Sequence, residues 1–374
     1  MRVRRRAAGA VLGLLLLIGG CAAPAPSPAP DTAAFQAAAD RRAAAVRAGD
    51  LADVPLGSWS YRVTDVRRDG DDRATARAEL RYRLAGYDSG VVTGERALKL
   101  ARRDGRWTVT SDRPARGAAQ QLWEQGDVDV VRGKKSLVLG VGQDAARLRS
   151  VAAAADRAVP AVSAAWPEGL WSRRVVVFVP ASLKEMGALL GEPAAGYRGI
   201  AAVTTGRVGG GPDGPADRVI VNPEAYAVLG EFGQRFVLAH ETTHVATRAH
   251  TSADTPLWLS EGFADWVAYR GTSRAPAQAA PELRDAVRAG RTPVALPADG
   301  DFSFAADAEA LARAYEGGWL ACELIADRWG EAKLRALYRA AGARGAERAL
   351  GEVLATTPEA FTAQWRGHLR ERLG

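Results

Sequence analysis

The chain has 374 residues, of which 47% are hydrophobic and 25% are charged, so it can form two domains and is too apolar to be disordered. Its formal net charge is +7, but residues 1–20 hold four arginines and no acid, and their removal as a leader would leave +3. So small a basic excess, without a basic stripe that interleaves with aromatic residues, argues against nucleic acid as a partner.

An export signal is expected at the N-terminus. Residues 1–20 combine an arginine-rich start with an apolar run that is shorter than a membrane span of about 20 apolar residues with flanks. The run ends in LIGGC, residues 17–21, which resembles a bacterial lipobox. That resemblance implies cleavage before Cys21, a diacylglyceryl group on its thiol, and an extracytoplasmic protein that is lipid-anchored to the bacterial cell membrane. The alternative is a plain signal peptide with a chance cysteine.

Residues 21–31 are rich in proline and alanine and predict an extended tether of roughly 3 Å per residue. The only other cysteine is Cys322, so no disulfide framework is expected. Its apolar neighbours, Trp319 to Ala321, favour a packing role for this thiol.

Residues 32–125 predict a small α+β domain, with a helix over 33–49 followed by strands. The strands are expected at Ser58–Val66, Ala74–Leu84, Glu95–Ala101 and Trp107–Ser111. In the second of them apolar residues alternate with charged ones, which is typical of a strand with one buried and one wet face. One helix followed by a meander resembles the cone-shaped fold of the nuclear transport factor and SnoaL-like superfamily. The resemblance assigns no chemistry to this domain.

Residues 127–374 predict a second domain, a mixed sheet followed by helices, which makes the fold class α+β. Strands are expected at Ser136–Val141 and at Arg174–Pro180, and the second is apolar enough to be central. Helices are expected over Gln143–Trp166, interrupted near Pro160, and over Ser182–Leu190, and from residue 228 to the end. Two further strand candidates are Ile200–Thr205 and Arg218–Asn222. The glycine-rich segment 209–214 between them opens no helix and lacks a following Lys-Ser/Thr, so it is not a phosphate-binding loop.

The sequence His240-Glu241-Thr242-Thr243-His244 has the pattern H-E-x-x-H. On a helix, residues four apart lie on one face, so both imidazoles can bind a single cation. Glu241 lies beside the first histidine, where it could take a proton from a water on the metal. The alternative is two unrelated histidines on the surface of a core helix.

A third ligand decides the class of site, and there are two candidates. His250 has the spacing of the third histidine in metzincins. That family needs a glycine where this chain has Thr247, and a methionine turn downstream, and this chain has neither. Glu261 follows Thr255 and Pro256, an N-cap and a first helical residue, so it is expected on a second helix that ends before Gly271. Two imidazoles and one carboxylate would leave the fourth position free for water, as in catalytic zinc sites.

The pattern H-E-x-x-H followed by W-L-x-E-G-x-A resembles the gluzincins, the peptidase MA-like clan that includes thermolysin and the alanyl aminopeptidases. The resemblance implies a zincin-like fold for residues 127–374. It implies Zn²⁺ on His240, His244 and Glu261, and Glu241 as the general base. The sixteen residues between His244 and Glu261 are slightly fewer than in those families, so the connection must be tighter.

Two more residues follow from the same resemblance. Asp265 stands where thermolysin-like enzymes keep an aspartate that is bonded to a ligand histidine; the alternative is an ordinary acid on a helix surface. Ala314 to Trp319 resembles the Tyr-Glu-x-Gly segment of the aminopeptidase branch, which implies that the Tyr315 hydroxyl donates to the oxyanion of the reaction. Core packing of Tyr315 is the alternative.

The function implied is zinc-dependent hydrolysis of peptide bonds in a peptide or protein substrate. The Gly-x-Met-Glu-Asn run that anchors a free amine in the aminopeptidases does not occur, so an endopeptidase is expected. In this clan the substrate lies antiparallel to an edge strand ahead of the metal helix, which would be Ile200–Thr205 or Arg218–Asn222. The alternative function is a catalytically silent zinc-fold lipoprotein that acts as a binding or scaffold protein.

Overall fold

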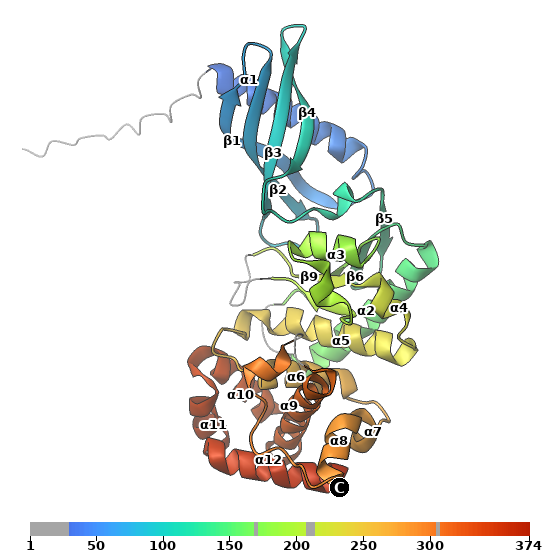
Figure 1. Ribbon diagram of the computed structural model, residues 1–374, viewed down its shortest axis with the longest axis vertical. Coiled ribbons are helices and arrows are strands. Elements are labelled where there is room, and N and C mark those ends of the chain that lie inside the picture. The colour runs from blue at the N-terminus through green and yellow to red at the C-terminus, as the bar shows by residue number, and fades with distance from the viewer. Residues whose placement is uncertain (1–29, 168–170, 207–213, 304–306) are drawn as a thin grey trace, which may run out of the picture.

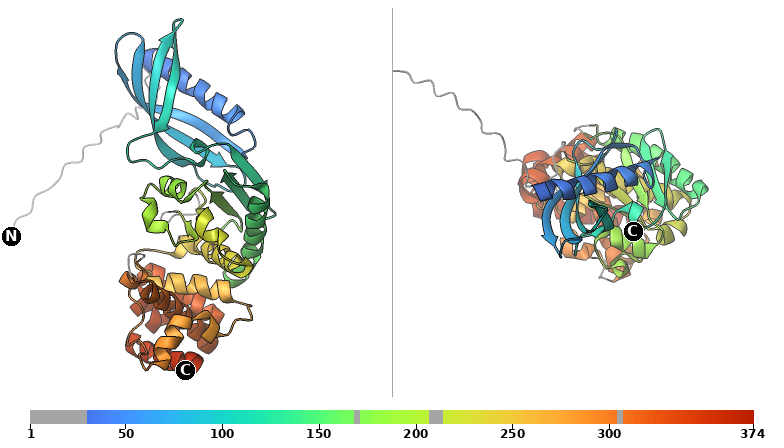
Figure 2. Two further views of the ribbon diagram at one scale, coloured as in Figure 1. Left: turned by 45° about the vertical axis from the view of Figure 1, so that its right-hand side comes forward. Right: turned by 90° about the horizontal axis from the view of Figure 1, so that it is seen from above.

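The computed structural model describes residues 30–167, 171–206, 214–303 and 307–374. The expected signal peptide, most of the tether and Cys21 lie outside them. The described chain is α+β, with two sheets and most of its helices after the second sheet. Three tiers follow one another along the molecule: an N-terminal sheet with one helix, a second sheet, and a helical part that ends at the C-terminus (Figure 1, Figure 2). Among the described helices, none has the length and apolarity that crossing a membrane requires.

The N-terminal tier consists of one helix and an antiparallel meander. Its elements are α1 (Pro30–Ala48), β1 (Leu56–Arg68), β2 (Arg73–Leu84), β3 (Val92–Arg103) and β4 (Arg106–Pro114). All four expected strands are present and each is longer than predicted. The alternation predicted for β2 is confirmed: Ala74, Ala76, Ala78, Leu80, Tyr82 and Leu84 are buried beneath α1 or against the second tier.

The second sheet has the strand order β5-β6-β7-β9-β8. Its elements, with the helices among them, are β5 (Val128–Arg132), β6 (Ser136–Val141), α2 (Ala145–Ala165), β7 (Val175–Val179), α3 (Leu183–Leu190), β8 (Ala202–Thr204) and β9 (Arg218–Val221). Strands β6, β7 and β9 are parallel, and β5 and β8 pair antiparallel at the two edges. The apolar strand β7 is central, as predicted, and β5 was not anticipated.

The two faces of this second sheet pack against different tiers. Leu137, Leu139, Val176, Phe178 and Ile220 share a core with the N-terminal sheet, whereas the residues that alternate with them pack against α2 and α5. A buried ion pair crosses the same boundary, because Arg218 on β9 donates two hydrogen bonds of 2.8 Å to Asp88 in the β2–β3 connection. The first two tiers therefore share one continuous core.

The remaining elements are helical. They are α4 (Pro223–Ala227), α5 (Glu231–Thr247), α6 (Leu257–Tyr269), α7 (Pro276–Ala279), α8 (Pro281–Arg288), α9 (Ala308–Trp329), α10 (Glu331–Arg344), α11 (Ala346–Leu354) and α12 (Pro358–Leu373). Their largest apolar cluster joins α6, α9, α10 and α12, and it includes the buried Cys322, in agreement with the packing role expected for that thiol.

Two helix predictions were wrong in detail. Helix α2 runs through Pro160 without interruption, because the proline ring is on the exposed face of the helix while Val159 and Val162 hold the other face in the core. Helix α6 begins one residue later than expected, with Pro256 as the N-cap. The Thr255 hydroxyl accepts a hydrogen bond from the Ser252 amide instead, and the Asp299 carboxylate accepts from the first amide of the helix, that of Leu257.

Candidate metal centre

Helix α5 carries both histidines of the H-E-x-x-H pattern on one face. The helix lies between the second sheet and α6, and the side chains of His240 and His244 are only 12% and 17% exposed. Their Nε2 atoms are 3.0 Å apart, so the two rings direct these nitrogens at the same point. The helix and the shared orientation predicted for this segment are thus present.

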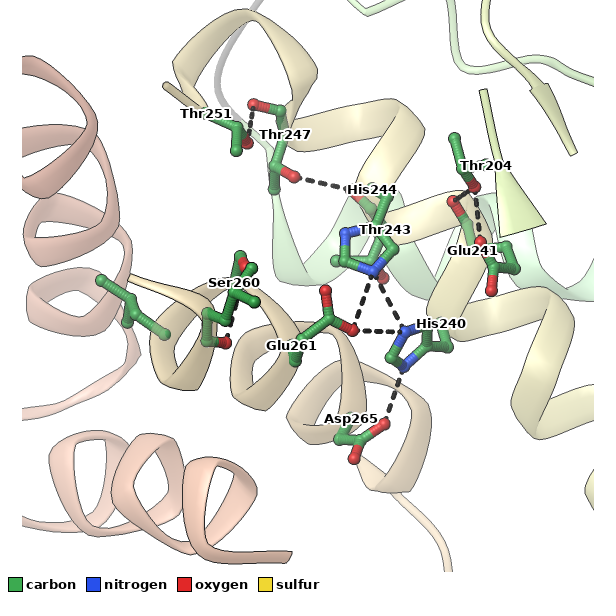
Figure 3. Close-up of polar contacts among 12 residues, drawn as sticks. Thr204, His240, Glu241, Thr243, His244, Thr247, Thr251, Ser260, Glu261 and Asp265 are labelled. Atoms are coloured by element: carbon green, nitrogen blue, oxygen red, sulfur yellow. Dashed lines mark hydrogen bonds and ion pairs between the residues drawn. The ribbon is translucent and has the colours of Figure 1, made fainter. Parts of the chain in front are cut away.

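Glu261 on α6 completes a group of three donor atoms. Its Oε2 is 3.2 Å from Nε2 of His240 and 3.4 Å from Nε2 of His244 (Figure 3). Around a tetrahedral zinc ion with bonds of about 2.0–2.1 Å, neighbouring ligand atoms lie about 3.3 Å apart. The three separations match that spacing, and the donor set is one that zinc prefers, so these residues fit the cation.

Asp265 lies one helical turn after Glu261 and contacts the other nitrogen of the first histidine. Its Oδ1 is 2.7 Å from Nδ1 of His240, and the carboxylate is buried. A carboxylate at this nitrogen holds the proton on Nδ1 and leaves Nε2 as the donor to a metal. The predicted contact is formed, and Asp265 is not a surface acid.

The competing ligand His250 lies elsewhere. It ends the short 3₁₀ turn Arg248–His250, and its ring packs against Trp166 at a centroid distance of 5.6 Å. Thr247, where a metzincin would have glycine, keeps a right-handed backbone with φ −87°. The described residues therefore bring Glu261, not His250, to the two histidines.

Glu241 is directed away from the three donors, toward the edge strand β8 (Figure 3). The hydroxyl of Thr204 donates to its Oε2 at 2.7 Å and also lies 3.0 Å from its backbone carbonyl oxygen. Thr204 was not identified from the sequence. Nothing local marks it, because its role depends on β8 being the strand next to α5.

Tyr315 reaches the centre from α9, and a glycine contact between α6 and α9 sets its position. A Cβ placed on Gly262 would lie 2.2 Å from the backbone oxygen of Gly318, so the two helix backbones touch at this point. The Tyr315 ring centroid is 6.3 Å from that of His240, and Phe302 packs edge-on against the Tyr315 ring at a centroid distance of 5.2 Å. Tyr315 thus borders the centre rather than serving only the core.

The pKa values of the centre are set by burial and by the opposite charges that face each group. Burial would lower the pKa of His240, but hydrogen bonds with Asp265 and Glu261 outweigh it and raise the pKa well above its ordinary value. Burial would raise the pKa of Glu261, but the two histidines hold it below its usual range. Burial raises the pKa of Glu241. Three carboxylates around two imidazoles therefore favour positive charge at this point, which a divalent cation would supply.

A cleft of about 810 Å³ opens over the centre. It is lined by most residues of the segment 195–204, which includes β8, and by α9 residues such as Leu311, Ala312 and Tyr315. One end is aromatic: Tyr269 packs against Phe236 and Trp319, each at a centroid distance of 4.5 Å. The size is that of a pocket for a small ligand or a few residues of an extended peptide.

Of the two strands that could form the edge of this cleft, the structure selects one. Strand β8 is at the edge of the sheet and borders the cleft, whereas β9 is paired on both sides. In the described part of the chain, no strand pairs with the outer edge of β8. Its backbone groups are therefore available to an extended ligand.

A second group of possible ligands, Glu323, Asp327 and His368, lies on α9 and α12. Here Glu323 already forms two hydrogen bonds with Arg372, at 2.7 and 3.2 Å, and one with His368 at 3.0 Å. This group is accounted for as an ion-pair cluster that joins the two helices.

A comparison of the sequence with protein-family models finds no match, and a comparison with curated proteins finds none either.

Proposed function

We propose that this protein is a zinc metallopeptidase of the gluzincin type, with a zincin-like domain over residues 127–374. It would act as an endopeptidase on peptides or proteins outside the cytoplasm, held to the bacterial membrane by a lipid at Cys21. The observation that carries the proposal is the convergence of three donor atoms, on His240, His244 and Glu261, at separations of 3.0–3.4 Å.

These three residues would hold the zinc ion, with Asp265 orienting the ring of His240. When bound there, zinc supplies Lewis-acid chemistry, which lowers the pKa of a water and polarises a carbonyl group. Two neutral imidazoles and one carboxylate leave part of the cation's charge uncompensated, which is what such chemistry requires.

Glu241 is the group that would move the proton. Its carboxylate would take a proton from the attacking water and return it to the leaving amine. The raised pKa that burial gives this carboxyl suits a group that must hold a proton between the two steps. The Thr204 hydroxyl holds the carboxylate in place at 2.7 Å, so we assign it a positioning role.

Tyr315 would stabilise the charge that develops on the substrate oxygen. Burial, and the nearby Glu261, raise the pKa of its hydroxyl, so this group stays protonated and can donate a hydrogen bond. An extended substrate would pair with the outer edge of β8, which presents its carbonyl carbon to the centre.

The alternative, a silent zinc-fold protein that only binds or supports a partner, has no observation of its own in its favour. A structural site would use its acids as ligands and would be closed. Here Glu241 is not among the three converging donors, and the centre lies in a cleft of about 810 Å³. Both features favour turnover.

The test is the substitution Glu241→Gln, with Glu231→Gln at the exposed start of the same helix as its control. We expect each variant to bind one zinc per chain, measured by elemental analysis, and only Glu241→Gln to lose cleavage of a quenched-fluorescent peptide library. Undiminished cleavage in Glu241→Gln would remove the proposed base. Purified wild-type protein that takes up no stoichiometric metal would remove the whole proposal.

A further inference from the structure

The solvent face of the N-terminal sheet is strongly basic. Because side chains alternate along a strand, β2 buries its apolar residues under α1 and exposes its charged residues on the other face. The arginines on this face come mainly from two neighbouring strands: Arg62, Arg67, Arg73, Arg77, Arg81 and Arg83. Strand β3 adds Lys99, which is in register with Thr75 and through it with Arg67.

Basic residues outnumber acidic ones on the strands of this face. The acids on these strands are Asp65, Glu79 and Glu95, and the β1–β2 connection adds Asp69, Asp71 and Asp72 at one end. Glu79 is already used, because it accepts hydrogen bonds from Arg62 at 3.2 Å and from Arg81 at 2.6 Å. Among the described residues no ion pair within 4 Å includes Arg67, Arg73, Arg77 or Lys99, although Asp65 faces Arg77 across the strand pair. The seven basic residues named on the strands outnumber the three acids there, which leaves an excess of positive charge on this face.

The face is also uncovered. Helix α1 packs on the opposite side of the sheet, and Figure 1 shows the strands β1 to β4 beside it with their other side free of the described elements. The positive charges thus form one broad surface that is not engaged by the rest of the described chain. Such a surface produces a field that attracts an extended anionic partner.

We propose that this basic face binds the surface of an anionic phospholipid membrane. A broad sheet of arginines with no aromatic side chain among them suits a charged planar surface, whereas proteins that bind single-stranded nucleic acid add aromatic platforms for the bases. The expected lipid on Cys21 would lie only nine residues ahead of α1, so the face would stay within reach of the membrane. Electrostatic contact would then supplement the lipid and fix how the protein is oriented.

The experiment uses the chain from Pro30 to Gly374, which holds every described element and lacks the anchor. Its binding to vesicles of phosphatidylglycerol and phosphatidylcholine, and to vesicles of phosphatidylcholine alone, is measured by co-sedimentation. We expect binding to the anionic vesicles only, and at least a tenfold loss of affinity between 0.05 and 0.3 M NaCl, as salt screens the charges. Both kinds of vesicle are tested at the same protein concentration.

Two triple variants of equal charge locate the surface. Arg67→Gln, Arg73→Gln and Arg77→Gln together should lower the affinity for anionic vesicles at least tenfold. The matched control, Arg149→Gln, Arg291→Gln and Arg370→Gln, removes three exposed arginines from the other tiers and should change the affinity less than twofold. Circular dichroism of both variants checks their fold, and the single variant Arg77→Gln should already show a loss of about threefold.

Three results would overturn the proposal. The first is no preference of the wild-type chain for anionic vesicles at low salt. The second is an equal loss in the two triple variants, which would make the attraction a property of net charge alone. The third is tighter binding to duplex DNA than to the anionic vesicles, which would assign the face to nucleic acid.

Discussion

Gly262 on α6 and Gly318 on α9 lie in direct backbone contact. A Cβ on Gly262 would come within 2.2 Å of the Gly318 oxygen, and a Cβ on Gly318 would lie 2.7 Å from the backbone oxygen of Trp258. Glu261 precedes the first glycine and Tyr315 lies nearly one turn before the second, so this contact sets the distance between a metal ligand and the proposed oxyanion donor. The close packing of α6 on α9 therefore explains the glycine in each of the two motifs, Gly262 in W-L-x-E-G-x-A and Gly318 in Tyr-Glu-x-Gly.

Gly262→Ala should be strongly destabilising. Alanine favours a helix over glycine by about 1 kcal/mol, but the clash would force the two helices apart and should cost about 2–4 kcal/mol net. Urea unfolding measures the change. Gly367→Ala on α12 is the control, because a Cβ there meets nothing within 4 Å, and it should be neutral or slightly stabilising. Equal stability of the two variants would show that α6 and α9 have room to separate.

Thr204→Val tests the positioning of the general base. Valine keeps the shape and removes the hydroxyl that donates to Glu241 at 2.7 Å, so the carboxylate loses its fixed orientation. We expect kcat to fall about tenfold with KM and zinc content nearly unchanged, and Thr204→Ser to restore most of the loss. A change confined to KM would instead assign Thr204 to substrate binding.

Glu316 should make stability depend on pH. Burial raises the pKa of its carboxyl from 4.5 to about 7, against the hydrogen bonds that it accepts from the backbone amides of Leu283 and Glu282. Between these pH values the folded state keeps a proton that the unfolded state has released. The contribution to the free energy of unfolding is therefore fully present below pH 4.5 and is lost as pH rises through about 7.

The variant Glu316→Gln removes this titration. The difference in unfolding free energy between the variant and wild type should shift in favour of the variant by on the order of 2 kcal/mol from pH 5 to pH 8. This value is reduced for the partial access of solvent. Urea unfolding at both pH values measures the difference. Glu309 is an exposed acid on the same helix, and the unfolding free energy of Glu309→Gln should change with pH as that of wild type does. If the unfolding free energy of Glu316→Gln also changed with pH as that of wild type does, the pKa of the Glu316 carboxyl would not be raised.

Asp88→Asn tests whether the first two tiers unfold together. The change leaves Arg218, which is 7% exposed, without its carboxylate partner, and removing one partner of a buried pair typically costs about 3–5 kcal/mol. Because the two tiers share a core, we expect one cooperative transition at a lower urea concentration, seen equally by tryptophan fluorescence and circular dichroism. Two separate transitions would show that the N-terminal tier folds independently.

Local patterns in the sequence determined which side chains share a face of a helix or strand, and the order of the elements along the chain. A spacing of four residues places His240 and His244 on one helix face, and the spacing from Glu261 to Asp265 does the same for two acids, because both depend only on helix geometry. The strict alternation of β2 likewise predicted a buried and a wet face from its own residues. The α+β order of elements and the central place of the apolar strand β7 followed from the same kind of pattern.

Only the tertiary structure decided the relationships between segments that are far apart. It chose β8 over β9 as the edge strand, brought Thr204 to Glu241, and joined the N-terminal sheet to the second one through a common core. It also gathered basic residues that are scattered along β1, β2 and β3 onto one face. Residue spacing within a helix or strand fixes which side chains share a face, but strand pairing and helix contact depend on packing among the whole set of elements, and no single segment encodes them.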